Sequence, residues 1–171
     1  TMVLAKDMEI EGLNAKGIAD FNSIPSLIQG RLIQGNSASP AKEIVLSKNI
    51  ATKLNIVVGD QVRLYFFQNN QVQERKLIVV GLFHSGIEEY DLKNVFVDIH
   101  LLQQMIQAPT AITGYQIHVK DLNKIDESQN QIQSMLPDNW VCSASTDLYP
   151  QLFDWIQVQS INRNITIVIM L

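Results

Sequence analysis

The sequence predicts an α+β fold in which short strands and helices mix without a strict alternation of strand and helix. Three observations support this class. Period-two apolar patterns mark strands, short period-3.6 patterns mark helices, and 171 residues suit one compact domain or two small lobes with a shared core. A chain of this length buries about 70% of its unfolded surface, so it needs no disulfide to fold.

Eight strands are predicted, each from alternating or β-branched apolar residues. They cover residues 2–6, 9–18, 43–46, 61–67, 72–83, 94–97, 114–119 and 140–143. The first two contain Gly12 and Gly17, which suit strands better than helices. Gly81, inside the fifth strand, predicts a bulge or a bend.

A β-hairpin is the strongest local pattern in the chain. Residues 61–67 place Val62, Leu64 and Phe66 on one side of a strand, and the β-branched stretch 72–83 forms the second strand. The polar residues 68–71 separate the two strands and are the expected turn.

Five helices are predicted. They cover residues 25–30, 48–54, 99–106 and 122–135, with a last helix that begins near residue 148. Pro25 suits the start of the first helix and Gly30 its end. Ser47 is the expected N-cap of the second helix and Asp121 that of the fourth. A loop over residues 35–42 follows the first helix.

Charge and composition exclude several classes of protein. The chain carries 13 Lys and Arg against 17 Asp and Glu, and it has no basic run, so a nucleic-acid binder is not expected. Only 18% of the residues are charged, against about 25% in ordinary domains, and Gln and Asn take their place. Cys142 is the single cysteine, so a disulfide-rich scaffold is excluded, and we expect it to be a small buried hydrophobe.

The two ends of the sequence are unusual. Residues 1–4 lack the basic and apolar regions of a signal peptide, so none is expected. Residues 161–171 close the sequence on an apolar, β-branched run that is shorter than the about 20 residues that span a bilayer. This run fits either a buried last strand or the first turns of a transmembrane helix.

One segment has the composition of a reaction centre. Neither the Lys-containing phosphate loop nor the dinucleotide fingerprint occurs, but His84, Ser85 and three carboxylates lie within residues 84–91. Such groups hold zinc or form a hydrolytic triad when rigid elements bring them together. A surface loop after a strand collects the same residue types, and we favour this structural interpretation.

The turn of the predicted hairpin is the best candidate for contact with a partner. A hairpin tip projects from its sheet, and aromatic side chains beside Arg are typical of interfaces. The candidate contact residues are Phe66, Phe67, Gln68, Asn69, Asn70, Gln71 and Arg75. The alternative is that Phe66 and Phe67 simply face the two sides of a covered strand.

Further motifs become informative when they are taken in order. They are Glu9-Ile10-Glu11-Gly12, Lys16-Gly17-Ile18, the stretch from Glu43 to Leu64 with its Val58-Gly59-Asp60, the stretch from Val79 to Asp91, Val95-Phe96-Val97, and Thr113-Gly114-Tyr115-Gln116-Ile117. The series covers nearly the whole chain and resembles the periplasmic core of ABC-transporter permeases of the lipoprotein-release (Lol) and MacB/FtsX-like class.

The resemblance implies a two-lobed domain, with one α/β lobe and one β-rich lobe, on the periplasmic side of the inner membrane. Residues 1–160 would lie between the first and second of four transmembrane helices, and residues 161–171 would begin the second helix. The implied partners are a cytoplasmic ATP-binding subunit, a second permease subunit, a lipoprotein substrate or periplasmic carrier, and the membrane through the flanking helices. No catalytic residue, cofactor or metal is implied, so the domain is expected not to be an enzyme.

The hairpin departs from the subunit that recruits the soluble carrier. In that subunit it resembles a long hook, whereas here only four residues separate Phe67 from Val72. A role like that of the partner subunit, or in a related exporter, fits better: a module that releases or guides lipoproteins while another subunit hydrolyses ATP. The alternative function is a free-standing small β-barrel, either a ligand-binding protein or a metal-dependent hydrolase that uses residues 84–91.

Overall fold

The computed structural model describes residues 2–6, 9–68, 71–121 and 124–148. The chain divides into two compact units, Thr1–Thr113 (unit 1) and Gly114–Leu171 (unit 2), which are described separately. Helices and strands both occur throughout unit 1, which confirms the predicted α+β class.

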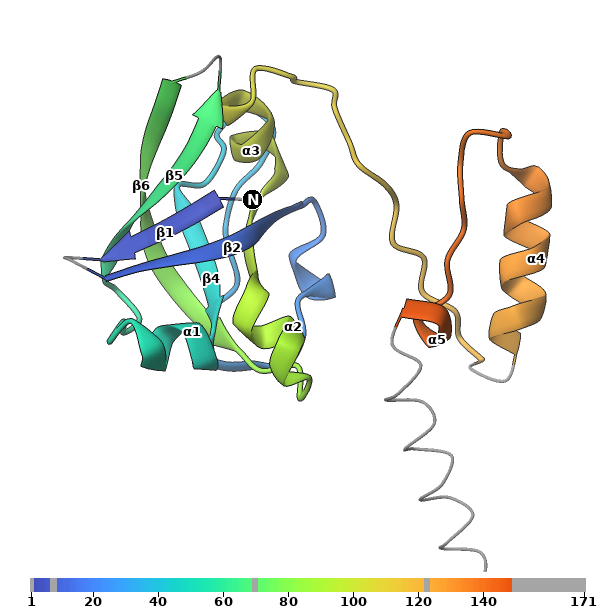
Figure 1. Cartoon of the computed structure of the whole chain (residues 1–171), viewed down its shortest axis with the longest axis horizontal. Coiled ribbons are helices and arrows are strands. Elements are labelled where there is room, and N and C mark those ends of the chain that lie inside the picture. Colours follow the sequence, from blue (N-terminus) through green and yellow to red (C-terminus); the bar gives the residue numbers. More distant parts are fainter. Residues whose placement is uncertain (1, 7–8, 69–70, 122–123, 149–171) are drawn as a thin grey trace, which may run out of the picture. The chain divides into compact units, whose positions relative to one another are not determined.

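The described part of unit 1 contains one mixed sheet of seven strands (Figure 1). They are β1 (Met2–Lys6), β2 (Glu9–Ile18), β3 (Leu27–Gly30), β4 (Glu43–Ser47), β5 (Gln61–Gln68), β6 (Gln71–Phe83) and β7 (Asn94–Asp98). Pairing runs in the order β3-β6-β4-β7-β2-β1-β5, and β5 also pairs with β6. Because β6 pairs first with β5 and then with β4, all strands except β3 close into a barrel.

Short helices cover the two ends of this barrel (Figure 1). They are α1 (Lys48–Lys53), α2 (Glu88–Lys93) and α3 (Ile99–Met105). The Ser47 side chain accepts a hydrogen bond from Ile50 N at 3.1 Å, so the predicted N-cap of α1 is confirmed. Asp98 caps α3 in the same way, through His100 N at 2.9 Å. Each cap satisfies a backbone donor that the first turn leaves free.

Two apolar clusters follow from the alternation of side chains along the strands. Ile44 and Leu46 of β4 point into the barrel, where they join Leu64, Leu77 and residues of α1 and α3. Val45, between them, points to the other face. The second cluster there contains Ile24, Ile33, Ala41, Val45, Val80, Phe83 and Phe96.

An ion pair fastens the loop that covers the second cluster. Arg31 donates to Glu43 through both of its terminal nitrogens, at 2.6 and 2.9 Å, and Gln34 N donates to the same carboxylate at 3.0 Å. The hydrogen bonds from Arg31 hold the pKa of Glu43 below its ordinary value and raise that of Arg31.

Residues 25–30, predicted as a helix, are not helical. The structure has a 3-10 turn, η1 (Phe21–Ser23), followed by β3. A helix this short gains few internal hydrogen bonds, whereas β3 pairs with the end of β6 and places Gly30 opposite Gly81. Tertiary pairing therefore overrides the local signal from Pro25.

Gly81 is required by the close approach of β3 to β6. A Cβ at Gly81 would lie 2.5 Å from the carbonyl oxygen of Arg31 and 2.8 Å from Leu27 Cδ1. The register between β4 and β6 shifts at this point, between Ile44 and Val45. The predicted bulge is confirmed.

The described part of unit 2 contains α4 (Ile125–Met135) and α5 (Ser145–Leu148). The strands predicted over residues 114–119 and 140–143 are not formed, and neither segment pairs with another within the described residues. Their apolar alternation is real, but a strand also needs a hydrogen-bonded neighbour. Lys124 rather than Asp121 is the N-cap of α4.

Glutamine side chains take the place of strand pairing in unit 2. Gln133 donates to Trp140 O at 3.1 Å and accepts from Cys142 N at 2.7 Å, while Gln129 donates to Cys142 O at 3.0 Å. These amides hold the backbone beside Cys142 against α4, which accounts for part of the high glutamine content. Cys142 itself is half-buried rather than fully buried.

Residues 149–171 lie outside the described part of the chain, and with them most of the last predicted helix and all of the run 161–171. Among the helices that the structure describes, none is long and apolar enough to cross a membrane.

Candidate functional site at the β5–β6 hairpin

The hairpin of β5 and β6 rises beside α3 at one end of the barrel (Figure 1). Its register runs without a break from Gln61 opposite Ile78 to Gln68 opposite Gln71. The connection is therefore residues 69–70, two residues rather than the four expected. Asn69, Asn70 and the side chain of Gln68 lie outside what the structure describes.

The two adjacent phenylalanines have opposite environments. Phe66 is 4% exposed and belongs to the barrel core, whereas Phe67 is 78% exposed. Alternation along a strand produces this difference, because Val62 and Leu64 point inward with Phe66. Phe66 is therefore no surface residue, and Phe67 is the phenylalanine of the pair that the hairpin exposes.

Val72 completes an exposed apolar pair at the tip. It lies directly opposite Phe67 in the register and is 58% exposed. Cross-strand neighbours on one face are close enough to act together. Sequence analysis missed Val72, although a two-residue connection would have placed it beside Phe67.

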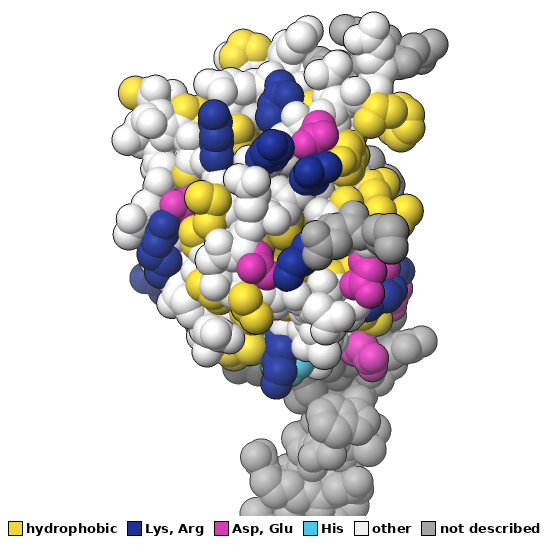
Figure 2. Space-filling model, turned by 90° about the vertical axis from the view of Figure 1, so that its left-hand side faces the viewer, with side chains coloured by type: hydrophobic (Ala, Val, Ile, Leu, Met, Phe, Trp, Pro, Cys, Tyr) yellow, Lys and Arg dark blue, Asp and Glu magenta, His cyan; other side chains and the backbone are white. Residues whose placement is uncertain are grey.

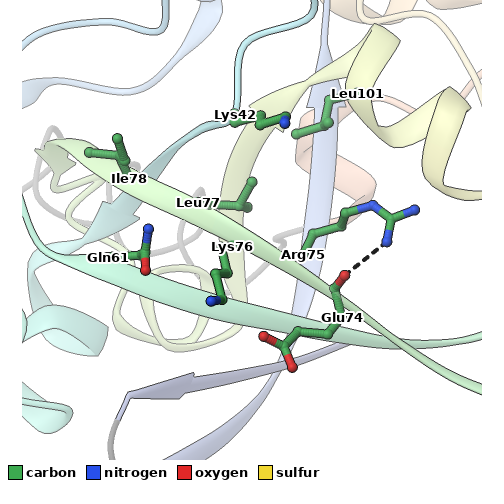
Figure 3. Close-up of a pocket in the computed structure, with 8 residues that line it drawn as sticks. All are labelled: Lys42, Gln61, Glu74, Arg75, Lys76, Leu77, Ile78 and Leu101. Carbon is green, nitrogen blue, oxygen red and sulfur yellow. Dashed lines mark hydrogen bonds between the residues drawn. The ribbon is translucent and has the colours of Figure 1, made fainter.

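A hollow of about 340 Å³ lies below the tip (Figure 3). It is lined by Lys42, Gln61, Glu74, Arg75, Lys76, Leu77, Ile78 and Leu101. Within the described ranges, Lys42, Arg75 and Lys76 form no ion pair with a carboxylate. Glu74, the acidic residue of the hollow, lies 3.7 Å from Arg63 Nε instead.

The hollow unites residues that are distant in the sequence. Lys42 precedes β4, and the parallel pairing of β4 with β6 brings it beside residues 75–78. In Figure 3, Lys42 and Arg75 extend on the Leu101 side of β6, and Lys76 extends toward β5. The sequence placed Arg75 near the hairpin, but no local pattern signals Lys42.

The buried carboxylate of Asp91 acts as a brace for residues 84–91, whose other side chains are exposed or half-buried. The Asp91 carboxylate is fully buried and accepts hydrogen bonds from His84 Nδ1 at 2.8 Å, Ser85 Oγ at 2.6 Å and Ser85 N at 3.1 Å. The Ser47 hydroxyl donates to the Asp91 carbonyl oxygen, which ties α2 to the start of α1. These hydrogen bonds compensate the cost of burying the carboxylate.

This arrangement does not match a hydrolytic triad. In a triad the serine hydroxyl bonds to the imidazole, whereas here the hydroxyl of Ser85 and the imidazole of His84 both bond to the Asp91 carboxylate. In the ranges that the structure describes, no three His, Cys, Asp or Glu side chains gather closely enough to hold a metal ion. The hydrogen bonds of Asp91 give the segment a structural role, and α2 (Glu88–Lys93) occupies part of it where a surface loop was expected.

A closed mixed barrel, with an exposed apolar pair and a basic hollow at one end, defines a small α+β domain. The model of the MacB-like periplasmic core domain family matches residues 5–135, and the chain belongs to this family. No curated protein matches the chain. The family makes the chain a periplasmic module of an ABC-transporter permease, whose partner is an ATPase subunit.

Proposed function

We propose that this module releases or guides lipoproteins at the inner membrane and contacts the lipoprotein, or its periplasmic carrier, with the tip of the β5–β6 hairpin. The exposed pair Phe67 and Val72 is the observation that carries the proposal. An aromatic and an aliphatic side chain on a projecting tip supply apolar contact area at low entropic cost. ATP hydrolysis in the partner subunit would move the module.

The barrel suits mechanical coupling. Both hairpin strands belong to the closed ring, β5 through β1 and β6 through β4, so a force on the ring reaches the tip without a flexible joint. The two-residue connection leaves no long hook for holding a carrier. A small apolar tip favours brief contacts, which suits guiding more than capture.

We further propose that residues 1–160 lie between the first two transmembrane helices of the permease and that residues 161–171 begin the second. The apolar, β-branched composition of 161–171 supports this placement. The gene should then encode about 20 apolar residues on each side of the segment, next to genes for an ATPase and a second permease subunit. A gene that encodes a soluble protein would contradict this proposal.

Site-specific photocrosslinking in the full-length permease tests the contact itself. A photoreactive residue at position 67 should crosslink to a lipoprotein substrate or carrier, and the yield should change with ATP. Val57 supplies the matched control position, because it is also apolar and 62% exposed but lies outside the hairpin. Equal crosslinking from both positions would contradict a specific contact at the tip.

A further inference from the structure

The base of the hairpin concentrates positive charge on a chain whose net charge is −4. Lys42, Arg75 and Lys76 line the hollow, and Arg63 lies opposite Lys76 in the register of β5 and β6. We call these four residues the basic cluster. Lys and Arg side chains gather around an acidic one in the upper part of Figure 2, which views the left side of Figure 1, where β5 and β6 lie.

The basic cluster is not explained by folding. Like charges directly opposite each other in a sheet are destabilising, as Arg63 and Lys76 are here. Glu74 offsets one of these charges at 3.7 Å from Arg63 Nε. Lys42 and Lys76 make no ion pair within the described residues. Lys42 and Lys76, two cations of the hollow that have no ion pair among the described residues, favour an anionic partner.

Apolar and basic groups follow one another along the hairpin axis. Residues 64–73 contain no charged side chain, and Phe67 and Val72 are exposed within this stretch. Arg75 and Lys76 follow Val72 by three and four residues, which is about 10 to 13 Å along a strand. Arg75 also leans toward the tip, since its Cζ lies 5.8 Å from the centre of the Phe66 ring.

We propose that the hairpin docks on the surface of a bilayer that contains anionic phospholipid. Phe67 and Val72 enter the boundary between headgroups and acyl chains, and the basic cluster binds the lipid phosphates above them. The order of the groups favours a membrane over an acidic protein, because a protein interface surrounds its apolar centre with a polar rim. A bilayer instead stacks its apolar and anionic layers along one axis, over a depth of about 5 to 10 Å for interfacial elements.

This inference deepens the proposed function and rests on it for the presence of a membrane nearby. A lipoprotein is anchored in a lipid leaflet before its release. A hairpin in the headgroup layer would therefore meet the lipoprotein at the point where its anchor emerges. The cationic side chains would hold the tip at that depth, and their attraction would weaken as salt screens it.

Vesicle binding by the purified chain tests the proposal. Phosphatidylcholine vesicles with and without about one quarter phosphatidylglycerol are compared at about 0.05 M and about 0.5 M NaCl. Lys42→Glu with Lys76→Glu is the test variant, and Lys48→Glu with Lys124→Glu is the control with the same change in net charge. All four lysines are exposed, so the substitutions spare the core.

Selective binding to the anionic vesicles at low salt is expected. The test variant should lose at least about 25-fold in affinity, because each lost cation accounts for about fivefold and each new carboxylate is repelled by the phosphates, and the control should stay within about twofold of the unchanged chain. Phe67→Ser with Val72→Ser should also weaken binding. Equal binding to both vesicle types, or equal losses in the two charge variants, would overturn the proposal.

Two further outcomes separate the inference from the proposed function. If the charges at positions 42 and 76 affect crosslinking from position 67 to a lipoprotein but not vesicle binding, the basic cluster binds protein and the membrane proposal is wrong. If vesicle binding behaves as expected but the permease releases no lipoprotein, the membrane contact stands and the proposed function fails.

Discussion

Replacement of Asp91 distinguishes a structural brace from a reaction centre. The carboxylate is fully buried and accepts hydrogen bonds from His84 Nδ1, Ser85 Oγ and Ser85 N at 2.8, 2.6 and 3.1 Å. Hydrogen bonds to a charged group contribute about 1.5 to 3 kcal/mol each, with imperfect additivity. Since His84 is half-exposed, Asp91→Ala should cost about 4 kcal/mol in the free energy of unfolding.

Urea denaturation followed by far-ultraviolet circular dichroism measures this cost, and the melting temperature should fall by about 15 °C. Asp91→Asn retains one acceptor oxygen and should cost about half as much. His84→Ala removes one half-exposed donor and should cost about 1 kcal/mol. A decrease of less than about 1 kcal/mol in the free energy of unfolding of Asp91→Ala would show that the Asp91 hydrogen bonds do not stabilise residues 84–91. A folded His84→Ala permease that releases no lipoprotein would point to chemistry at the loop.

Three further predictions follow from burial, packing and charge. Phe66→Ala should cost about 3 to 4 kcal/mol in urea denaturation, whereas Phe67→Ala should stay within about 0.5 kcal/mol of the unchanged chain. Gly81→Val should cost about 2 kcal/mol or more, because its side chain meets the backbone of β3, and a lower melting temperature would report it. In Glu43→Gln, the free energy of unfolding measured in urea should fall less as the pH is lowered. Because Arg31 lowers the pKa of Glu43, the pair stabilises the fold above about pH 4.5, and this contribution is lost as the pH falls through the lowered pKa.

These three predictions have distinct contradicting results. Equal losses for the two phenylalanine variants would mean that the alternation along β5 is misassigned. An unchanged melting temperature for Gly81→Val would mean that β3 does not pack closely on β6. If the free energy of unfolding falls equally for the original and Glu43→Gln chains between about pH 6 and about pH 3, the pair with Arg31 has no energetic role.

Local sequence patterns predicted an element correctly where one face of a strand is apolar or a cap residue marks the start of a helix. The apolar alternation of Val62, Leu64 and Phe66 predicted β5, and Ser47 predicted the start of α1, because each signal depends on neighbours in the sequence. The sequence predicts a surface loop where α2 forms, although Glu88 and Glu89 are favourable in the first turn of a helix.

The remaining features depend on contacts between distant segments. No local signal shows that Gly30 will lie opposite Gly81, so β3 was mistaken for a helix. The segment 114–119 has the composition of a strand, but no described neighbour pairs with it. Lys42 reaches the hollow through the pairing of β4 with β6, which sequence alone does not specify.

Lipoprotein release by the complete transporter should require the hairpin tip. The direct test is ATP-driven release of a lipoprotein from proteoliposomes that contain the complete transporter, with Phe67→Ser and Val72→Ser introduced together. Because both side chains are exposed, the variant should fold and continue to hydrolyse ATP while lipoprotein stays in the membrane. Release at the original rate by the folded variant would contradict the account.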